Sequence, residues 1–203
     1  MTKLLLILLL FCIKLNVLIA QEQSYEIIVA SKKVGSLRVS QTEKGDKQII
    51  KAQTDAEVSI LWKHHVKKTN WELHFEDDVL IKSSTISHFN GDLEDSVMLQ
   101  YHQPKYVGYL HPDQRIVIDR PIVITTSNLY YREPLKIDSV FSERFLAWCK
   151  LELVSENKYK LILPDGTMNS YTYSSGILKE IYVDRPWFNI KIVRESAKSE
   201  TPK

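Results

Sequence analysis

The chain has 203 residues, with 27 Lys and Arg against 25 Asp and Glu. This near balance of charge argues against a nucleic-acid-binding protein and against a polybasic membrane-binding site. Six Gly and seven Pro are too few for a fibrous or disordered chain, and ten Tyr and four Trp suit a β-rich protein.

The first twenty residues have the composition of a secretory leader. Lys3 gives a positive start, an apolar run covers residues 4–13, and Ala20 precedes a candidate cleavage point. Lys14 interrupts the apolar run, which is shorter than the roughly 20 residues of a membrane-spanning helix. A cleaved signal peptide over residues 1–20 is therefore favoured over an uncleaved anchor, and we expect no transmembrane span in the mature chain.

Removal of this leader changes the charge and cysteine content. Two of the 27 basic residues lie in it and none of the acids, so 25 basic and 25 acidic residues remain. Cys149 is then the only cysteine and cannot form an internal disulfide. An exported chain without an internal disulfide suits a bacterial envelope, so we expect a periplasmic or secreted protein.

Residues 21–194 are enough for a single domain with a sizeable core, and the polar residues 195–203 are expected to form a disordered tail. Alternating apolar and polar residues predict many short strands, and Asn90-Gly91 is the strongest hairpin signal. In the first half, strands are expected at 25–30, 36–42, 47–54, 57–63, 66–76, 79–89, 93–102, 106–110, 115–119 and 122–125. The segments 47–54 and 57–63 could form one long strand or two, with a break near Asp55-Ala56.

Residues 127–148 break this alternation, and their apolar spacing favours one or two short helices or an irregular crossing. Ser127 is a candidate N-cap for a helix over 128–132, which Pro134 would end. Strands are expected again at 150–154, 158–163, 168–173, 177–184 and 187–194.

This pattern predicts an all-β fold with a meandering antiparallel sheet. Nearly all connections are short, so strands that are neighbours in sequence should pair in space. The sheet is expected to be strongly curved, either as a barrel or as an open half-barrel around the segment 127–148. The pattern leaves closed and open forms as alternatives.

The C-terminal half resembles an uncharacterised family of exported, β-rich proteins of Gram-negative bacteria, a domain of unknown function. The segments that carry the resemblance are Tyr130-Tyr131-Arg132-Glu133-Pro134, Val140-Phe141-Ser142-Glu143-Arg144, Leu163-Pro164-Asp165-Gly166 and Asn169-Ser170-Tyr171-Thr172-Tyr173, followed by Ser174-Ser175-Gly176-Ile177. The resemblance implies an exported β-protein and no activity. At the level of fold alone, the rhythm of strands and turns is similar to envelope proteins of the lipoprotein-carrier kind.

A polar and aromatic cluster is expected in the irregular segment. The candidate ligand-binding residues are Tyr130, Arg132, Glu133, Phe141, Glu143 and Arg144. They could lie at the mouth of a cavity, where Arg132 or Arg144 would hold an anionic group. Alternatively, the same charges could form ion pairs that fix the segment against the sheet, which is the commoner arrangement.

No motif predicts a catalytic, cofactor or metal site. The six histidines lack the close spacing of zinc ligands, and neither a nucleophile elbow nor a phosphate-binding glycine loop occurs. Cys149, flanked by Trp148, has the surroundings of a core cysteine. We therefore predict no catalytic residues, no metal and no cofactor.

The sequence favours a non-enzymatic protein that binds an apolar or amphipathic ligand, or an envelope partner, in the concave face of its sheet. This hypothesis expects a continuous apolar cavity beside Tyr130, Phe141 and Phe145. Further aromatic residues could line it: Trp62, Trp71, Tyr101, Tyr106, Tyr109, Tyr159, Tyr171, Tyr173 and Trp187. The alternatives are an assembly subunit that pairs through a sheet edge, and an unrecognised hydrolase that uses Glu133, Glu143 or a histidine.

Overall fold

The computed structural model describes residues 18–60, 63–185 and 188–196, whose regular structure is almost entirely β-strand. The first eight strands are β1 (Leu18–Val29), β2 (Lys32–Lys44), β3 (Lys47–Ile60), β4 (Lys63–Glu76), β5 (Val79–Phe89), β6 (Asp92–His102), β7 (Lys105–Leu110) and β8 (Gln114–Ile118). A short 3₁₀-helix follows, η1 (Thr126–Tyr130), and then β9 (Ser139–Ser142), β10 (Ala147–Ser155), β11 (Lys158–Ile162), β12 (Met168–Ser174), β13 (Ile177–Val183) and β14 (Ile190–Arg194).

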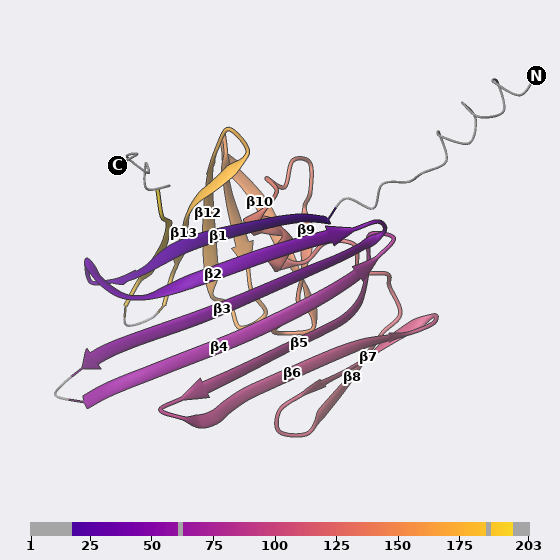
Figure 1. The fold of residues 1–203 in the computed structure, drawn as a ribbon, viewed down its shortest axis with the longest axis horizontal. Helices are drawn as coiled ribbons and strands as arrows, with labels where there is room; N and C mark the ends of the chain where they lie inside the picture. Colours follow the sequence, from indigo (N-terminus) through magenta and orange to yellow (C-terminus); the bar gives the residue numbers. More distant parts are fainter. Residues whose placement is uncertain (1–17, 61–62, 186–187, 197–203) are drawn as a thin grey trace, which may run out of the picture.

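All 14 strands belong to one antiparallel sheet, in the order β8-β7-β6-β5-β4-β3-β2-β1-β14-β13-β12-β11-β10-β9. Consecutive strands pair within each half, and β14 returns to join β1, with Tyr25 opposite Arg194. Strands β8 and β9 form the two ends of this order, so the sheet is not closed. In Figure 1, β1–β8 make a broad slanting layer and β9–β13 lie behind it. The prediction of a single curved, meandering sheet is confirmed.

The structure corrects two strand predictions. The expected break near Asp55 is absent, because Asp55 pairs with Ser36 on one side and Lys68 on the other, and this pairing overrides its low strand propensity. The expected strand at 122–125 is instead an extended segment with one isolated parallel bridge, between Thr125 and Phe141.

The helix also begins earlier than expected. Thr125, and not Ser127, is the N-cap, and η1 ends at Tyr130. Asn128 Oδ1 accepts hydrogen bonds from the backbone N and the hydroxyl of Thr125, at 2.7 and 3.0 Å. The side chain of Ser127 is therefore free to bond elsewhere.

Residues 1–17 of the expected signal peptide lie outside the described residues, and Leu18–Ala20 are the first residues of β1. Of the expected tail, only Glu195 and Ser196 are described. The predicted boundaries of the leader and of the single domain stay predictions.

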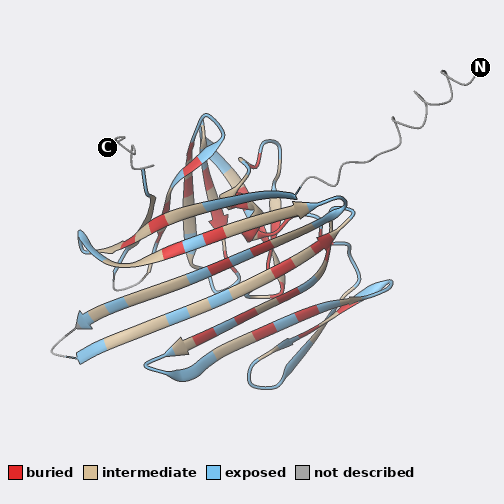
Figure 2. Cartoon of the chain, viewed as in Figure 1, coloured by how far each residue is buried: buried red, intermediate tan, exposed pale blue. Residues whose placement is uncertain are grey.

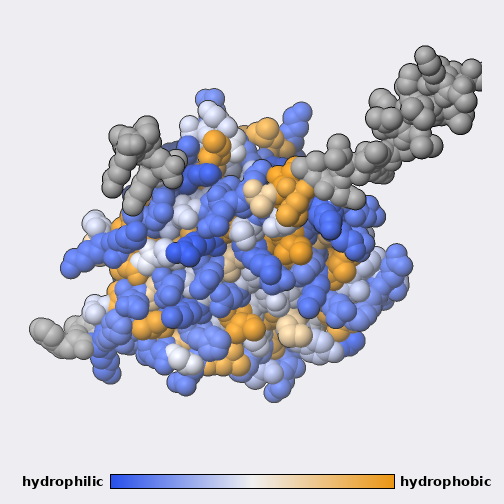
Figure 3. All heavy atoms as spheres, in the orientation of Figure 1, coloured by the Kyte–Doolittle hydropathy of each residue, from blue (hydrophilic) through white to orange (hydrophobic). Residues whose placement is uncertain are grey.

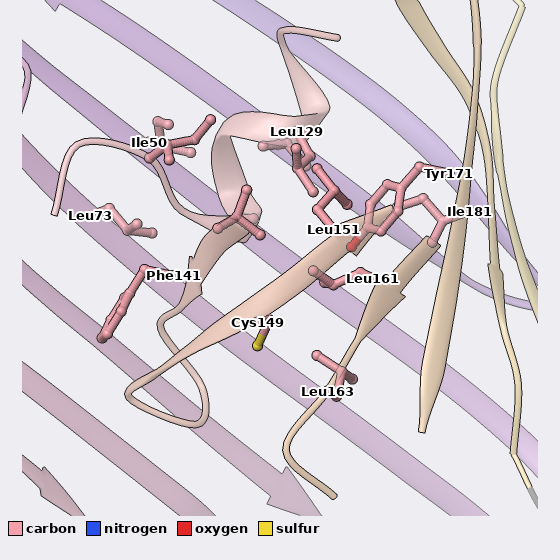
Figure 4. Packing of buried hydrophobic residues seen from close by; sticks show 14 of the residues in the cluster. Ile50, Leu73, Leu129, Phe141, Cys149, Leu151, Leu161, Leu163, Tyr171 and Ile181 are labelled. Atoms are coloured by element: carbon pink, nitrogen blue, oxygen red, sulfur yellow. The ribbon is translucent and has the colours of Figure 1, made fainter. Parts of the chain in front are cut away.

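The core lies between the two halves of the sheet. Buried positions alternate along the strands with more exposed ones (Figure 2). Ile50 and Leu73 project from the first half and Leu161 and Ile181 from the second, with Leu129 of η1 between them (Figure 4). On the face seen in Figure 3, hydrophilic side chains predominate and apolar ones are scattered among them, so the main apolar cluster is internal.

Residues 119–138, here called the crossing segment, connect the two ends of the open sheet. The backbone N of Ile122 donates to the Tyr106 hydroxyl of β7 at 3.1 Å, and its carbonyl accepts from the backbone N of Leu80 at 2.8 Å. Two residues later, the carbonyl of Ile124 accepts from the backbone N of Phe141 in β9, at 3.0 Å. Backbone polar groups inside the molecule are thus satisfied without a closed barrel.

Replacing Tyr106 with Phe should destabilise the protein by about 1 to 3 kcal/mol, because the buried Ile122 N–H would lose its acceptor. The measurement is the free energy of unfolding from urea denaturation. Tyr109→Phe is the matched control, since Tyr109 lies on the same strand and is exposed. If the two variants lose equal stability, Tyr106 does not anchor the crossing segment.

Candidate functional site

A partly open cavity of about 250 Å³ lies between the concave side of the sheet, the crossing segment and the turn that joins β9 to β10. Its wall combines hydroxyl-bearing, aromatic and charged side chains from both halves of the sheet. The lining residues are Thr54, Thr69, Trp71, Thr85, Thr126, Ser127, Tyr130, Ser142, Glu143, Arg144, Phe145, Leu161, Leu163, Asn169, Tyr171 and Arg185.

One wall is polar because Thr54 of β3, Thr69 of β4 and Thr85 of β5 line it. On β5, Ser83 and Ser87 flank Thr85 at alternate positions and are buried as well, where an apolar residue would be usual, although Thr85 alone of the three lines the cavity. The Thr69 and Ser87 hydroxyls are hydrogen-bonded across strands at 2.9 Å. Register also places Thr54 opposite Thr69, which extends the polar surface to β3.

Glu143 forms the floor of the cavity and is only 5% exposed. Its Oε2 accepts a hydrogen bond from the Thr126 hydroxyl at 2.5 Å, and its Oε1 accepts one from the Ser127 hydroxyl. The Ser127 Oγ in turn accepts from Trp71 Nε1 at 3.1 Å. This chain of bonds joins the β9–β10 turn to η1 and to β4.

Burial raises the pKa of the Glu143 carboxyl, and the hydrogen bonds from Ser127 and Thr126 oppose that shift without cancelling it. The protein therefore favours the neutral form of this side chain more than water does.

Two arginines lie at the open side of the cavity. Arg144 is exposed in the β9–β10 turn, and Arg185 is half-buried just after β13. Burial lowers the pKa of Arg185, and the nearby positive Arg144 lowers it further, although Asp165 works in the opposite direction. The two positive charges are thus close enough to influence each other.

The structure brings only some of the predicted site residues together. Tyr130, Glu143 and Arg144 line the cavity. Arg132 is exposed elsewhere on the crossing segment, and Glu133 accepts a hydrogen bond from the Tyr159 hydroxyl at 3.0 Å. The predicted cluster is therefore divided between the cavity and the surface around it.

Phe141 is a further correction, because it is fully buried and packs edge-on against Trp148 with ring centroids 5.7 Å apart. Its ring therefore occupies part of the space in which a continuous apolar cavity was expected. The observed cavity is bounded by Tyr130 and Phe145 but is mixed in polarity.

Among the aromatic residues expected on the concave face, Trp71 and Tyr171 line the cavity. The others belong to the core or its border (Tyr101, Tyr106, Tyr159, Tyr173), are exposed (Tyr109), or lie outside the described residues (Trp62, Trp187).

Sequence reasoning missed Arg185 and Asn169, which also line the cavity. Arg185 lies between the strands expected at 177–184 and 187–194, and no local pattern relates it to Arg144. The run Ser83–Ser87, with hydroxyls at alternate positions of a strand, was the available signal for a polar inner wall.

Within the described residues, no group of three or more His, Cys, Asp and Glu side chains is arranged to hold a metal ion. None of the cavity-lining residues is a histidine. Burial raises the pKa of the Cys149 thiol to about 11, so the reactive thiolate is disfavoured at neutral pH. No helix in the described residues is long and apolar enough to cross a membrane.

A family model for a domain of unknown function, DUF6134, matches residues 25–195. No match was found among curated proteins. The crystal structure of a beta-barrel-like protein of domain of unknown function DUF1849 from Brucella abortus is similar to this chain, with a TM-score of 0.59 and 10% identity. The similarity covers 88% of this chain and 96% of that one, and at this identity it concerns the fold alone. The expectation of an uncharacterised β-rich domain is confirmed.

Replacing Glu143 with Gln should reduce the pH dependence of stability. The folded protein binds the carboxyl proton more tightly than the unfolded chain does, whose pKa is near the ordinary value of 4.5. The stability that comes from this proton is complete below the unfolded pKa and is lost as the pH rises through the raised, folded pKa. The free energy of unfolding of the wild type minus that of the variant should therefore fall as the pH rises from about 4 to about 8.

The measurement is urea denaturation over this pH range, with Glu156→Gln as the control because Glu156 is exposed in a turn. The control difference should stay flat. A flat difference for Glu143→Gln as well, or one that rises with pH, would contradict the buried neutral carboxyl.

Proposed function

We propose that this protein, which belongs to the DUF6134 family, is a non-enzymatic binding protein that takes a small amphipathic molecule into the cavity above Glu143. The observation that carries the proposal is the cavity itself, which is partly open and is lined by both aromatic and hydrogen-bonding groups. Its occupant needs both an apolar and a polar part.

The apolar part of the ligand has aromatic contacts available. The rings of Trp71, Tyr130, Phe145 and Tyr171 line the cavity, beside the hydroxyl-rich wall of β3–β5. A volume of about 250 Å³ is at the small end of ligand sites, which usually span about 300 to 1,000 Å³. It suits a small molecule or one end of a longer one.

Binding without chemistry is also favoured by how the carboxyl groups are held. Glu143 accepts bonds from Thr126 and Ser127, whereas Glu133 accepts from Tyr159, so the two acids have separate partners. A hydrolase that used this pair would need both acids to converge on one substrate. The lining also offers no histidine as a base.

The proposal includes an exported location, in the periplasm or outside the cell. Its support is the leader-like composition of residues 1–20.

A second candidate function, assembly through a sheet edge, is favoured by one observation. In the described residues β8 pairs with β7 alone, and Val117 of β8 is exposed near the exposed cross-strand pair Met98 and Tyr109, although Arg115 is the residue directly opposite Tyr109. An unpaired edge beside apolar side chains is a common site for strand addition. The partner would be a second copy or an envelope protein.

The binding proposal predicts that the neutral fluorescent probe phenylnaphthylamine binds the wild type and that Thr54→Phe weakens this binding at least about tenfold. Thr54 lines the cavity, so a phenyl ring there occupies the space of the ligand. Gln53→Phe is the matched control, since Gln53 is the neighbouring residue on the same strand and is exposed.

The measurement is fluorescence titration of variants whose unfolding free energies show that they are folded, with Thr69→Phe as a second blocking variant. Equal affinities in the blocking and control variants would place the probe elsewhere and overturn the proposal. Native mass spectrometry of the full chain isolated from its own cells would identify a retained occupant.

The edge hypothesis predicts self-association that Val117→Lys abolishes, because a charge on this face disfavours a strand partner. Analytical ultracentrifugation over a range of concentrations measures it, with Leu153→Lys as a control at another exposed strand position. Pairing with a second copy is contradicted if the wild type is monomeric throughout.

A further inference from the structure

We infer that the polar end of the ligand is an anion, a carboxylate or a phosphate, and that the guanidinium groups of Arg144 and Arg185 hold it at the open side of the cavity. The inference rests on the proposed function, because it specifies the ligand chemistry of that same site.

Both arginines are free to donate to a ligand. None of the ion pairs in the described part of the chain involves Arg144 or Arg185. The protein hydrogen bond recorded for the Arg185 guanidinium joins its Nη1 to the carbonyl of the preceding Asp184, at 3.2 Å. The Arg144 guanidinium lies 5.4 Å from the centre of the Phe145 ring. A planar guanidinium with unused donors is suited to a carboxylate or phosphate.

Asp165, whose charge acts on Arg185, forms its hydrogen bonds elsewhere. Asp165 Oδ1 already accepts hydrogen bonds from the backbone N and the hydroxyl of Thr167, at 3.0 and 2.6 Å. Burial acts to raise the pKa of Asp165, but these bonds, with help from Arg185 and Arg144, lower it overall. Asp165 thus interacts with the arginines through its charge, while its Oδ1 accepts its hydrogen bonds from Thr167. The guanidinium donors stay available for a ligand.

The charge of the cavity lining also favours an anion. Its charged residues are Arg144, Arg185 and Glu143, and the carboxyl oxygens of Glu143 are occupied by Thr126 and Ser127. Burial raises the pKa of Glu143, so its charge opposes the two arginines less than that of a solvated carboxylate would. A bound anion would add negative charge beside them.

The residues that line the cavity also include one buried polar atom without a hydrogen-bond partner in the described part of the chain. Asn169 Oδ1 is buried and has no hydrogen-bond partner among the described residues, although Asn169 lines the same cavity as the arginines. Buried polar atoms without partners are uncommon in folded proteins and often mark the place of a bound group. A ligand with a hydroxyl, or a protonated phosphate oxygen, would donate to it.

The test compares two probes that differ by one charged group, phenylnaphthylamine and anilinonaphthalene sulfonate, on the full chain. We expect the sulfonate to bind more tightly than the neutral probe, and its advantage to shrink as salt is added. Arg185→Gln should weaken sulfonate binding about tenfold and Arg144→Gln about threefold, because Arg144 is the more exposed. Neither change should alter binding of the neutral probe by more than about twofold.

Arg132→Gln is the matched control, since Arg132 is an exposed arginine that does not line the cavity. Arg185→Lys keeps the charge and should restore part of the sulfonate affinity. If the neutral probe binds as tightly as the sulfonate, or if Arg132→Gln has the same effect as Arg185→Gln, the anion inference is overturned while the binding function stands. If neither probe is excluded by Thr54→Phe, the proposed function itself fails.

The same titration distinguishes the source of the anion. Decanoate and decyl phosphate are added as competitors of the sulfonate probe, and inorganic phosphate is added alone. Displacement by either decyl compound at concentrations where inorganic phosphate has no effect supports an amphipathic anion, and the stronger competitor identifies the group. Equal displacement by inorganic phosphate would overturn the requirement for an apolar part.

Discussion

The structure depends on how one open sheet covers its own concave face. A sheet of 14 strands whose ends, β8 and β9, do not meet leaves two edges and an apolar interior to protect. The crossing segment covers part of the interior, because its backbone bonds to Tyr106 and Leu80 on one side and to Phe141 of β9 on the other. The Tyr173 hydroxyl adds a bond to the carbonyl of Leu129, at 2.7 Å. The inward-facing residues of the segment are therefore part of the core, whereas β8 keeps one edge without a strand partner among the described residues.

The position of the cavity follows from this arrangement. The bulky side chains Leu129 and Phe141 are fully or almost fully buried and fill the space between the two halves. Beside them, the inner positions of β5 are Ser83, Thr85 and Ser87, which are too small and too polar to complete an apolar core. A cavity remains where the polar wall begins. The buried Glu143 then costs less than an isolated carboxyl, because Thr126 and Ser127 satisfy its oxygens.

Sequence patterns predicted much of the fold because most strands pair with the strand next to them in the sequence. Val79–Phe89 has the same bounds in the sequence prediction and in the structure, since Asp77-Asp78 and Asn90-Gly91 form turns at both ends with positive φ. The short strand β9 was not predicted. This strand forms because it pairs with β10 and makes one bridge to Thr125. The alternation of apolar and polar residues in the sequence does not indicate either contact.

The site was less predictable than the fold for a related reason. Tyr130, Glu143 and Arg144 were predicted because they lie in one irregular segment, and Trp71 was predicted only as one of many aromatic residues. Arg185, which follows β13, was missed because it is far from the other residues in sequence. Arg132 and Arg144 carry the same charge, so charge alone could not predict which of them lines the cavity. Their burial and their neighbours in the folded chain decide this. The site departs from the usual pattern of a core in two ways. Small hydroxyl residues occupy inward positions of β5, and a buried carboxyl lines the same cavity as two arginines. Such departures cost stability, and they are expected at functional sites, where a local rule of folding gives way to the needs of the site.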